Sequence, residues 1–306
     1  MKGGNILYKT KRKGPVYELS LPKEWSGKTV DFILKNEWQL SKKMIHQWRM
    51  EKAVQVNGQS LSWQAPLQEG DVLHIPLFRD AGDAPAPSYL DIAILYEDDH
   101  LLVVDKPAGV KTHPNDEQEK GSLLNAAAYH LQSAGDRSFI RHVHRLDEQT
   151  SGVVLFAKHE AAYTVLSRLL ENRLIKRTYV AAVHGILRKA QGTINEPIGR
   201  DRHHPTKRRV SKSGQPALTR FEVLKHNKSR QLSIVKCQLA TGRTHQIRVH
   251  FSAIGHPLAG DLLYGGKPIV HRQALHAAEI EIPHPFTGET LTCQSAVPDD
   301  IRSLFE

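Results

Sequence analysis

A polar, charged segment that runs directly into a short apolar strand constrains the fold of this chain more than any other feature. The five residues Val153-Val154-Leu155-Phe156-Ala157 are all apolar, and their number and composition are typical of a buried strand. The segment before them, His144 to Gly152, is mostly polar and carries Asp147 close to Arg145. We therefore expect a rigid buried strand that anchors a polar, charged loop.

A carboxylate among cations suits a nucleophile or a general base, because neighbouring positive charge keeps the acid ionised. Arg141, Arg145, His142 and His144 all lie within six residues of Asp147. The alternative is a structural ion pair between Asp147 and Arg145. Local composition does not decide between these two interpretations.

The net charge points to a polyanionic partner. The chain has 306 residues, of which 40% are hydrophobic, enough for a large core, and its formal charge is +10. Self-repulsion of this size does not stabilise a folded protein, so nucleic acid is the expected partner. The alternative is a basic protein whose charge serves no partner.

Composition also bears on the compartment. No run approaches the roughly 18 apolar residues of a membrane-spanning helix, and the basic residues 1–14 lack the apolar segment of a signal peptide. Two cysteines, Cys237 and Cys293, favour a reducing environment without a disulfide framework. We expect a cytoplasmic protein that has no contact with membranes.

The N-terminal quarter predicts a compact basic module. Ser41 is a suitable cap for a helix that buries an apolar stripe and leaves Lys42, Lys43 and Arg49 elsewhere. Asn57-Gly58 predicts a tight hairpin, and Gly70-Asp71 predicts a turn. On these features residues 15–77 resemble the S4 RNA-binding domain, whose expected RNA contacts are Lys42, Lys43 and Arg49. The alternative is an ordinary solvated basic helix.

We expect three parts along the chain: an S4-like domain over residues 1–78, a linker over 79–90 and a catalytic domain over 91–306. The linker is rich in Pro, Ala and Gly, so it should let the small domain reach RNA independently of the large one. Removal of residues 1–78 should then leave the large domain folded.

Strand patterns dominate the large domain. The expected helices follow Ser122, span about 160–172 and recur briefly near 245–254, while the expected strands cover 92–95, 101–104, 177–183, 217–224, 231–239, 274–282 and 291–294. This order predicts an α+β fold with a mixed, mainly antiparallel sheet.

Three further stretches carry groups suited to RNA chemistry. Tyr179 begins a strand behind three cations, where it could stack on a base for about 1–3 kcal/mol or simply pack in the core. Arg243 and Arg248 follow the turn at Gly242, so that one is expected to reach phosphate and the other to point inward. An inward arginine needs a carboxylate partner, because an unpaired buried charge is costly. The alternative is phosphate contact by both.

The third stretch, residues 200–209, is a dense cationic loop. We expect Arg202, Lys207 and Arg208 to clamp phosphate, although a merely solvated loop is the alternative. The 18 histidines are not arranged with cysteines or acids at zinc-binding spacing, and neither a glycine-rich phosphate loop nor a nucleophilic serine motif occurs. Metal, nucleotide and serine chemistry are therefore not expected.

Taken together, these motifs resemble the RluA family of RNA pseudouridine synthases. The resemblance rests on H-R-L-D-x-x-T-S-G at 144–152, E-D-D-x-L-L-V-V-x-K-P-A-G at 97–109, K-x-x-Y at 176–179 and G-R-T-H-Q-I-R-V-H at 242–250. Gly255-His256-Pro257-Leu258 and Gly260-Asp261 follow in family order. Asp105 departs from the pattern, since the family often has Asn there.

The resemblance implies a pseudouridine synthase fold with a central catalytic cleft, and isomerisation of uridine to pseudouridine in structured ribosomal or transfer RNA without a cofactor. It implies that Asp147 is the nucleophile, that Tyr179 packs against the target base, that Arg248 pairs with the aspartate and that Arg145 intercalates where the nucleotide leaves the stack. No protein partner is implied, and we expect a monomer.

Two other functions remain open at this point. The charge and the N-terminal module fit a non-catalytic RNA-binding protein, although such a protein does not need Asp147, Tyr179 and Arg248 together. A nuclease or glycosylase built on Asp147 is the third possibility.

Overall fold

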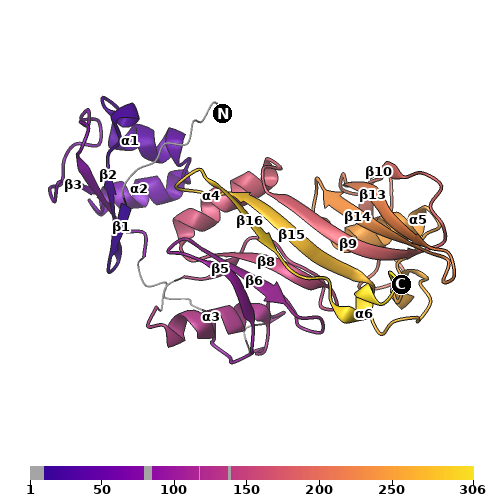
Figure 1. Ribbon diagram of the computed structural model, residues 1–306. Helices are drawn as coiled ribbons and strands as arrows, with labels where there is room; N and C mark the ends of the chain where they lie inside the picture. The colour runs from indigo at the N-terminus through magenta and orange to yellow at the C-terminus, as the bar shows by residue number, and fades with distance from the viewer. Residues whose placement is uncertain (1–9, 79–84, 117, 137–138) are drawn as a thin grey trace.

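A ten-stranded sheet organises residues 93–294 in the computed structural model, which describes residues 10–78, 85–116, 118–136 and 139–306. Its strand order is β10-β13-β14-β9-β15-β8-β6-β5, with β16 paired to β15 and β7 paired to β8. Helices α3, α4 and α5 lie against this sheet (Figure 1). The strands of this sheet are β5 (Ala93–Glu97), β6 (Leu101–Lys106), β7 (Arg141–His142), β8 (Ser151–Ala157), β9 (Lys176–His184), β10 (Gln191–Asn195), β13 (Leu218–Asn227), β14 (Leu232–Leu239), β15 (Leu275–Pro283) and β16 (Thr290–Gln294).

The remaining elements of this part are helices and one small hairpin. They are α3 (Leu123–Ser133), α4 (Glu160–Glu171), β11 (Ile198–Arg200), β12 (Arg208–Val210), α5 (Gln246–Ala253), the 3₁₀ turn η3 (Leu262–Tyr264) and α6 (Asp299–Arg302). The expected helices and strands are therefore present within a few residues of their predicted ends. The loop expected at 200–209 is different, because its two ends pair as the antiparallel strands β11 and β12.

The sheet is mixed but mainly antiparallel, as predicted. Within it only β8 and β15 run parallel among the described residues, with Ser151 opposite His276 and Gly152 opposite Ala277. All seven residues of β8 are buried, which confirms the buried strand expected at Val153–Ala157. Strand β15 separates β8 from β9, so the start of β8 and the middle of β9 face each other across a single strand.

Gly152 makes the parallel contact possible. Its φ is +112°, and a Cβ built there would lie 2.1 Å from the carbonyl oxygen of Ala277. No other residue fits this close approach, since the backbone of β15 cannot move without breaking its pairing with β9. The glycine that ends the polar segment therefore fixes where the loop containing Asp147 enters the sheet.

A second sheet, with the order β1-β2-β4-β3, forms the small N-terminal unit. Ser41 caps its main helix by accepting a hydrogen bond from the Met44 amide, as predicted. The unit consists of β1 (Thr10–Lys13), β2 (Val16–Ser20), the 3₁₀ turn η1 (Lys23–Trp25), α1 (Val30–Phe32), the π-helical turn η2 (Ile33–Glu37), α2 (Lys42–Met50), β3 (Gln55–Val56) and β4 (Val72–Ile75).

The hairpin expected around Asn57-Gly58 is only partly correct. Both residues have positive φ, 51° and 76°, and Val56 bridges Gln59 across the turn. The returning arm does not continue as a strand, however, because β3 pairs with β4 instead. The tight turn follows from local sequence, whereas the strand partner is chosen by the rest of the module.

The N-terminal unit packs directly on the large part through an aromatic cluster. Tyr17 and Phe78 meet His100 at ring-centroid distances of 5.0 and 6.1 Å, and Trp38 meets Phe286 at 4.9 Å. Burial lowers the pKa of His100 to about 3, so this residue stays uncharged at neutral pH. These contacts form one continuous apolar core with β6, β8 and α4.

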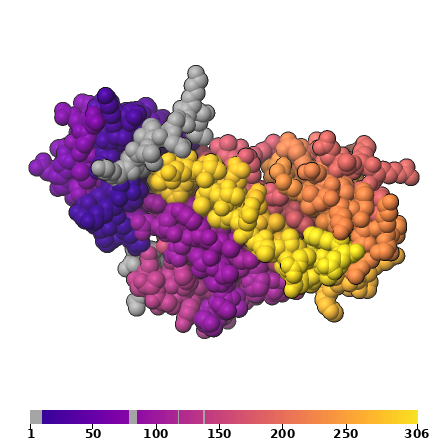
Figure 2. Space-filling view, in the orientation of Figure 1, coloured from indigo at the N-terminus to yellow at the C-terminus, as the bar shows by residue number. Residues whose placement is uncertain are grey.

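This packing differs from the expectation of a small domain that moves freely on a linker. Residues 79–84, most of the predicted linker, lie outside the described residues. Figure 2 shows the C-terminal segment as a band that crosses one face of the molecule and reaches the N-terminal unit. Removal of the unit would expose Phe286 and His100, so it is no simple appendage of the large part.

We expect Gly152→Ala to destabilise the protein by about 4 kcal/mol or more, because the new methyl group collides with a strand backbone. Gly135→Ala is the matched control, since Gly135 also has positive φ but has open space around its Cβ position. That change should cost only about 1–2 kcal/mol of backbone strain. Denaturant unfolding of both variants tests the assignment, and equal losses would contradict it.

Candidate active site

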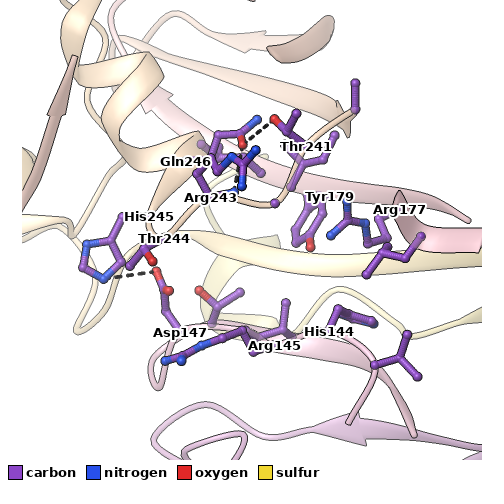
Figure 3. Close-up of a pocket in the computed structure, with 18 of the residues that line it drawn as sticks. His144, Arg145, Asp147, Arg177, Tyr179, Thr241, Arg243, Thr244, His245 and Gln246 are labelled. Atoms are coloured by element: carbon purple, nitrogen blue, oxygen red, sulfur yellow. Dashed lines mark hydrogen bonds and ion pairs between the residues drawn. The ribbon is translucent and has the colours of Figure 1, made fainter. Parts of the chain in front are cut away.

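A pocket of about 500 Å³ opens where the loop before β8, the strand β9 and the loop before α5 converge. Asp147 and Arg145 line one side, while Thr241 to Gln246 line the other (Figure 3). The ring of Tyr179 lies between these two sides (Figure 3). The structure thus brings together three of the four motifs at 97–109, 144–152, 176–179 and 242–250, and the remaining one, at 97–109, holds the Asp147 loop from behind.

The backbone on both sides of Asp147 is held by buried donors. The Thr112 hydroxyl donates to the carbonyl of Leu146 at 2.9 Å and accepts from the Leu146 amide at 3.0 Å. On the other side, Lys106 Nζ donates to the carbonyl of Glu148 at 2.8 Å. The residue at 147 is therefore flanked by two anchored peptide groups, and its side chain leaves the loop in one direction.

Lys106 holds more than one carbonyl. Its side chain is buried, and Nζ also donates to the carbonyls of Val110 at 2.6 Å and Pro107 at 3.0 Å. Burial lowers the pKa of Lys106 to about 7, and the charge of Asp147 opposes that shift. Three carbonyl acceptors match the three donors of an ammonium group, so the residue is a clamp for this turn.

Arg248 joins two carboxylates. Its Nη1 donates to Asp147 Oδ2 at 2.9 Å, while Nε and Nη2 donate to the two oxygens of Asp261 at 2.7 and 2.9 Å. Although burial alone lowers it, the pKa of Arg248 is raised above its ordinary value by Asp261 and Asp147. An inward arginine with a carboxylate partner was expected after Gly242, and the structure contains two such partners.

Arg145 does not pair with Asp147 in the described structure. Its side chain is exposed, and its Nη1 donates to His113 Nε2 at 3.3 Å. The structural ion pair between Arg145 and Asp147, which composition left open, is thus absent. Arg145 lines the pocket with an exposed side chain, whereas Asp147 is fixed by Arg248.

Tyr179 lies in the wall of the pocket and is nearly buried, with 4% of its surface exposed. It stands opposite Ala277 of β15 and Cys237 of β14 in the sheet. Burial raises the pKa of Tyr179, and the charge of Arg177 opposes this shift. The tyrosine is therefore a neutral aromatic surface at physiological pH that faces the same space as Asp147.

The residues expected to contact RNA are dispersed. Lys42 and Lys43 are exposed at the start of α2. Arg49 is exposed too, but it forms an ion pair with Asp31 and lies 5.2 Å from the ring centre of Trp63. Arg243 lines the pocket and donates to the carbonyl of Pro216 at 3.1 Å. None of these positions contradicts a role in RNA binding.

The cationic residues of the β11–β12 hairpin lie close to the pocket. Arg202 is exposed at its tip, whereas Lys207 and Arg208 are half-buried against Tyr264. The amide of Arg208 donates to the Tyr264 hydroxyl at 2.9 Å. Tyr264 in turn lies 5.0 Å below the guanidinium of Arg248. The expected clamp is thus a hairpin that packs on Tyr264, and Arg202 is exposed at its tip.

Sequence reasoning did not assign a role to several residues of this site: Lys106, Thr112, His245, Asp261 and Tyr264. Asp261 and His245 lie inside motifs that were recognised. The motifs therefore indicated that these residues matter but did not predict which groups they contact. Thr112 and Tyr264 carried no signal, because an ordinary hydroxyl gains its role here only from tertiary contacts.

Among the described residues, no group of three or more His, Cys, Asp or Glu side chains is placed to hold a metal ion. Within the same residues, no helix has the length and apolar character needed to cross a membrane.

Two family models match the chain. Residues 100–253 match the model described as RNA pseudouridylate synthase. Residues 17–73 match the N-terminal domain of the RluD ribosomal pseudouridine synthase. The match over residues 100–253 includes all four motifs apart from residues 97–99. The match over residues 17–73 covers most of the small N-terminal sheet and its helices.

Individual proteins give the same result. The chain is 44% identical to the uncharacterised RNA pseudouridine synthase YhcT of Bacillus subtilis, over 96% of this chain and 97% of that protein. It is 36% identical to the ribosomal large subunit pseudouridine synthase D of Nitrosomonas europaea, over 94% and 87%. Among solved structures, human RNA pseudouridylate synthase domain containing 1 aligns with a TM-score of 0.59 and 27% identity, over 74% and 91%.

We expect Arg248→Gln to destabilise the protein by about 3–5 kcal/mol, because Asp261 would remain as a buried carboxylate without its partner. Arg202→Gln is the matched control, since Arg202 is exposed, and it should change stability by no more than about 0.5 kcal/mol. Urea unfolding at neutral pH measures both. A loss below about 1 kcal/mol for Arg248→Gln would show that the bridge is not a structural element.

Proposed function

This chain belongs to the family of RNA pseudouridine synthases, which isomerise uridine to pseudouridine in RNA, and we propose that Asp147 is the nucleophile of this reaction. The target uridine is a nucleotide that has been flipped out of a structured RNA. The observation that carries this proposal is the Asp147 carboxylate, which faces the pocket with one oxygen held 2.9 Å from Arg248. Its side chain is only 21% exposed, so the pocket shelters it without closing it off.

The chemistry explains why such a site suffices. Uracil breaks its bond from N1 to the ribose C1′ carbon, turns while it is held, and forms a new bond from C5 to C1′. The proton leaves C5 and N1 gains one, so the reaction needs neither an oxidant nor an external group. Asp147 attacks the pyrimidine ring or C1′ in the two possible routes, and both require a carboxylate that is ionised and oriented.

Tyr179 and Arg145 fit the handling of the nucleotide. A uridine inside a helix cannot reach Asp147, so it must turn out of the stack at a cost of a few kcal/mol, roughly. Tyr179 offers the extruded base an aromatic face worth about 1–3 kcal/mol. Arg145 is exposed and lines the pocket, and in this proposal it enters the stack that the nucleotide leaves and so offsets that cost.

The RNA surfaces extend beyond the pocket. We propose that residues 1–78 act as an S4-like RNA-binding domain through Lys42, Lys43 and Arg49, that 79–90 link it to the catalytic domain 91–306, and that Arg202, Lys207, Arg208 and Arg243 contact phosphates near the target. The enzyme then acts as a monomer, since a single chain supplies every group named here. A cytoplasmic site of action fits Cys237 and Cys293, which are buried and unpaired.

The proposed substrate is ribosomal RNA, with transfer RNA as the alternative. The relative from Nitrosomonas europaea is named for the large ribosomal subunit, and the N-terminal match is to a ribosomal enzyme. Mapping pseudouridine in the ribosomal and transfer RNA of cells with and without the gene distinguishes the two. Loss of a site in one class only identifies the substrate.

We expect Asp147→Asn to abolish isomerisation, lowering the rate on the order of 10⁴-fold or more, because the amide is not a nucleophile. The measurement is release of tritium from RNA labelled at C5 of uridine. Glu148→Gln is the control, since the Glu148 side chain is exposed beside Asp147 and the hydrogen bond from Lys106 goes to its backbone carbonyl, so this variant should keep most of the activity. Tritium release by Asp147→Asn at the wild-type rate would exclude Asp147 as the nucleophile.

We expect the double variant Lys42→Gln/Lys43→Gln to bind its RNA more weakly and to lower the slope of log affinity against log salt by about 1–2. Each lysine that contacts a phosphate releases roughly one counterion, so the slope counts the contacts. Arg188→Gln/Lys189→Gln is the control, because that exposed pair lies between β9 and β10, at the far end of the sheet (Figure 1). Filter binding from low to high salt measures both. An unchanged slope in the first variant would remove α2 from the RNA surface.

A further inference from the structure

His245 adopts a backbone conformation that histidine rarely takes. It stands at the N-terminus of α5 with φ 57° and ψ 23°, in the left-handed region, and its side chain makes no capping hydrogen bond. This conformation costs a residue with a Cβ about 1–2 kcal/mol. Such strain persists where the surroundings fix it and is concentrated at functional sites. The strain here turns the imidazole toward the pocket, where it faces Asp147 (Figure 3).

Both ring nitrogens of His245 have defined neighbours. Nδ1 lies 2.8 Å from the hydroxyl of Tyr264, and Nε2 lies 3.8 Å from Asp147 Oδ2. The two rings of His245 and Tyr264 meet edge to face at 5.6 Å, which fixes the plane of the imidazole. The histidine is thus held on one side by a phenol and directed on the other side at the carboxylate.

The hydroxyl of Tyr264 favours one tautomer of His245. This oxygen accepts a hydrogen bond from the Arg208 amide at 2.9 Å, and in the described structure His245 Nδ1 lies 2.8 Å away, where it can accept the phenol's own proton. With the phenol as donor, Nδ1 is the acceptor and the proton of the neutral ring resides on Nε2. Burial lowers the pKa of His245, although the charge of Asp147 opposes the shift, so the ring is neutral at physiological pH.

Two donors consequently converge on one oxygen of Asp147. Arg248 Nη1 donates to Oδ2 at 2.9 Å, and the Nε2–H of His245 approaches the same atom at 3.8 Å. Among the described residues, Oδ1 has no hydrogen-bond partner, which leaves it as the oxygen available to a substrate. The separation of 3.8 Å is longer than a hydrogen bond, as catalytic contacts often are before substrate binds.

We infer that His245 is a positioning residue for the isomerisation: its Nε2–H acts with Arg248 on Oδ2 of Asp147 and directs Oδ1 at the target uridine, while Tyr264 fixes the ring that does so. This inference rests on the proposed role of Asp147 as nucleophile. Its physical basis is that displacing a reacting group by about 1 Å lowers the reaction rate by roughly 10²-fold, even when substrate binding is unaffected.

Two substitutions separate positioning from a purely structural role. Asparagine tolerates the left-handed backbone and can accept from Tyr264, but its amide ends near the Nδ1 position and does not reach Asp147. Glutamine is less suited to that backbone, but its amide N–H reaches the Nε2 position. If His245 has only a structural role, the asparagine variant should be the more active of the two. If His245 positions Asp147, the glutamine variant should be the more active.

We expect His245→Asn to lower the single-turnover rate about 10²-fold with an unchanged dissociation constant for RNA, and His245→Gln to retain activity within about 10-fold of the wild type. Tyr264→Phe, which keeps the ring and removes the hydroxyl, should lower the rate by roughly 10-fold and add nothing to His245→Asn in the double variant. Single-turnover tritium release, RNA binding and thermal unfolding are measured for each variant.

Wild-type activity of His245→Asn overturns the inference, as do equal losses in the asparagine and glutamine variants or additive effects with Tyr264→Phe. Wild-type protein and Asp147→Asn are measured in the same assay. If the wild type releases no tritium, or if Asp147→Asn releases it at the wild-type rate, the proposed function fails independently of His245.

Discussion

The bridge from Arg248 to Asp147 and Asp261 is the interaction on which the site depends. One guanidinium donates to both carboxylates, and Asp261 is almost entirely buried. The two carboxylates oppose the loss of the arginine proton, and the attraction of the guanidinium holds Asp147 in place. Asp261 anchors the arginine, and the arginine in turn anchors Asp147. The site is thus built from the interior outward.

The fold contributes the second half of this arrangement. Arg248 comes from α5, whereas Asp147 comes from a loop that the sheet holds through Gly152 and through Lys106 and Thr112. The two elements belong to different parts of the chain, 101 residues apart. Their distance is therefore set by the close approach of β8 to β15 and by the packing of α5 on the sheet. A small shift of β8 against β15, or of α5 against the sheet, would displace the Asp147 carboxylate from Arg248. The buried hydrogen bonds to the backbone around Asp147 oppose such a shift.

Sequence reasoning predicted the parts of this structure that depend on local pattern. The buried strand at Val153–Ala157, the Ser41 cap and the inward arginine with an acidic partner were all predicted, because periodicity, capping and charge burial act over short distances. The partner Asp261, the strained His245 and the pairing of β3 with β4 were not, since each depends on elements that meet only in the fold. The hairpin at β11 and β12 was taken for a loop because its cations concealed the short strand ends.

The packing of the N-terminal unit on the large part was also beyond the reach of local pattern, since its aromatic cluster combines Tyr17 and Phe78 with Phe286 near the other end of the chain. This packing changes how the proposed RNA surfaces work together. A unit on a free linker loses conformational entropy each time it binds an RNA that is also bound at the pocket. A docked unit has already lost that entropy on folding. An RNA that contacts both α2 and the pocket must then fit one spacing and one orientation. Shape, which proteins read readily in structured RNA, thereby becomes part of the selection of the target uridine.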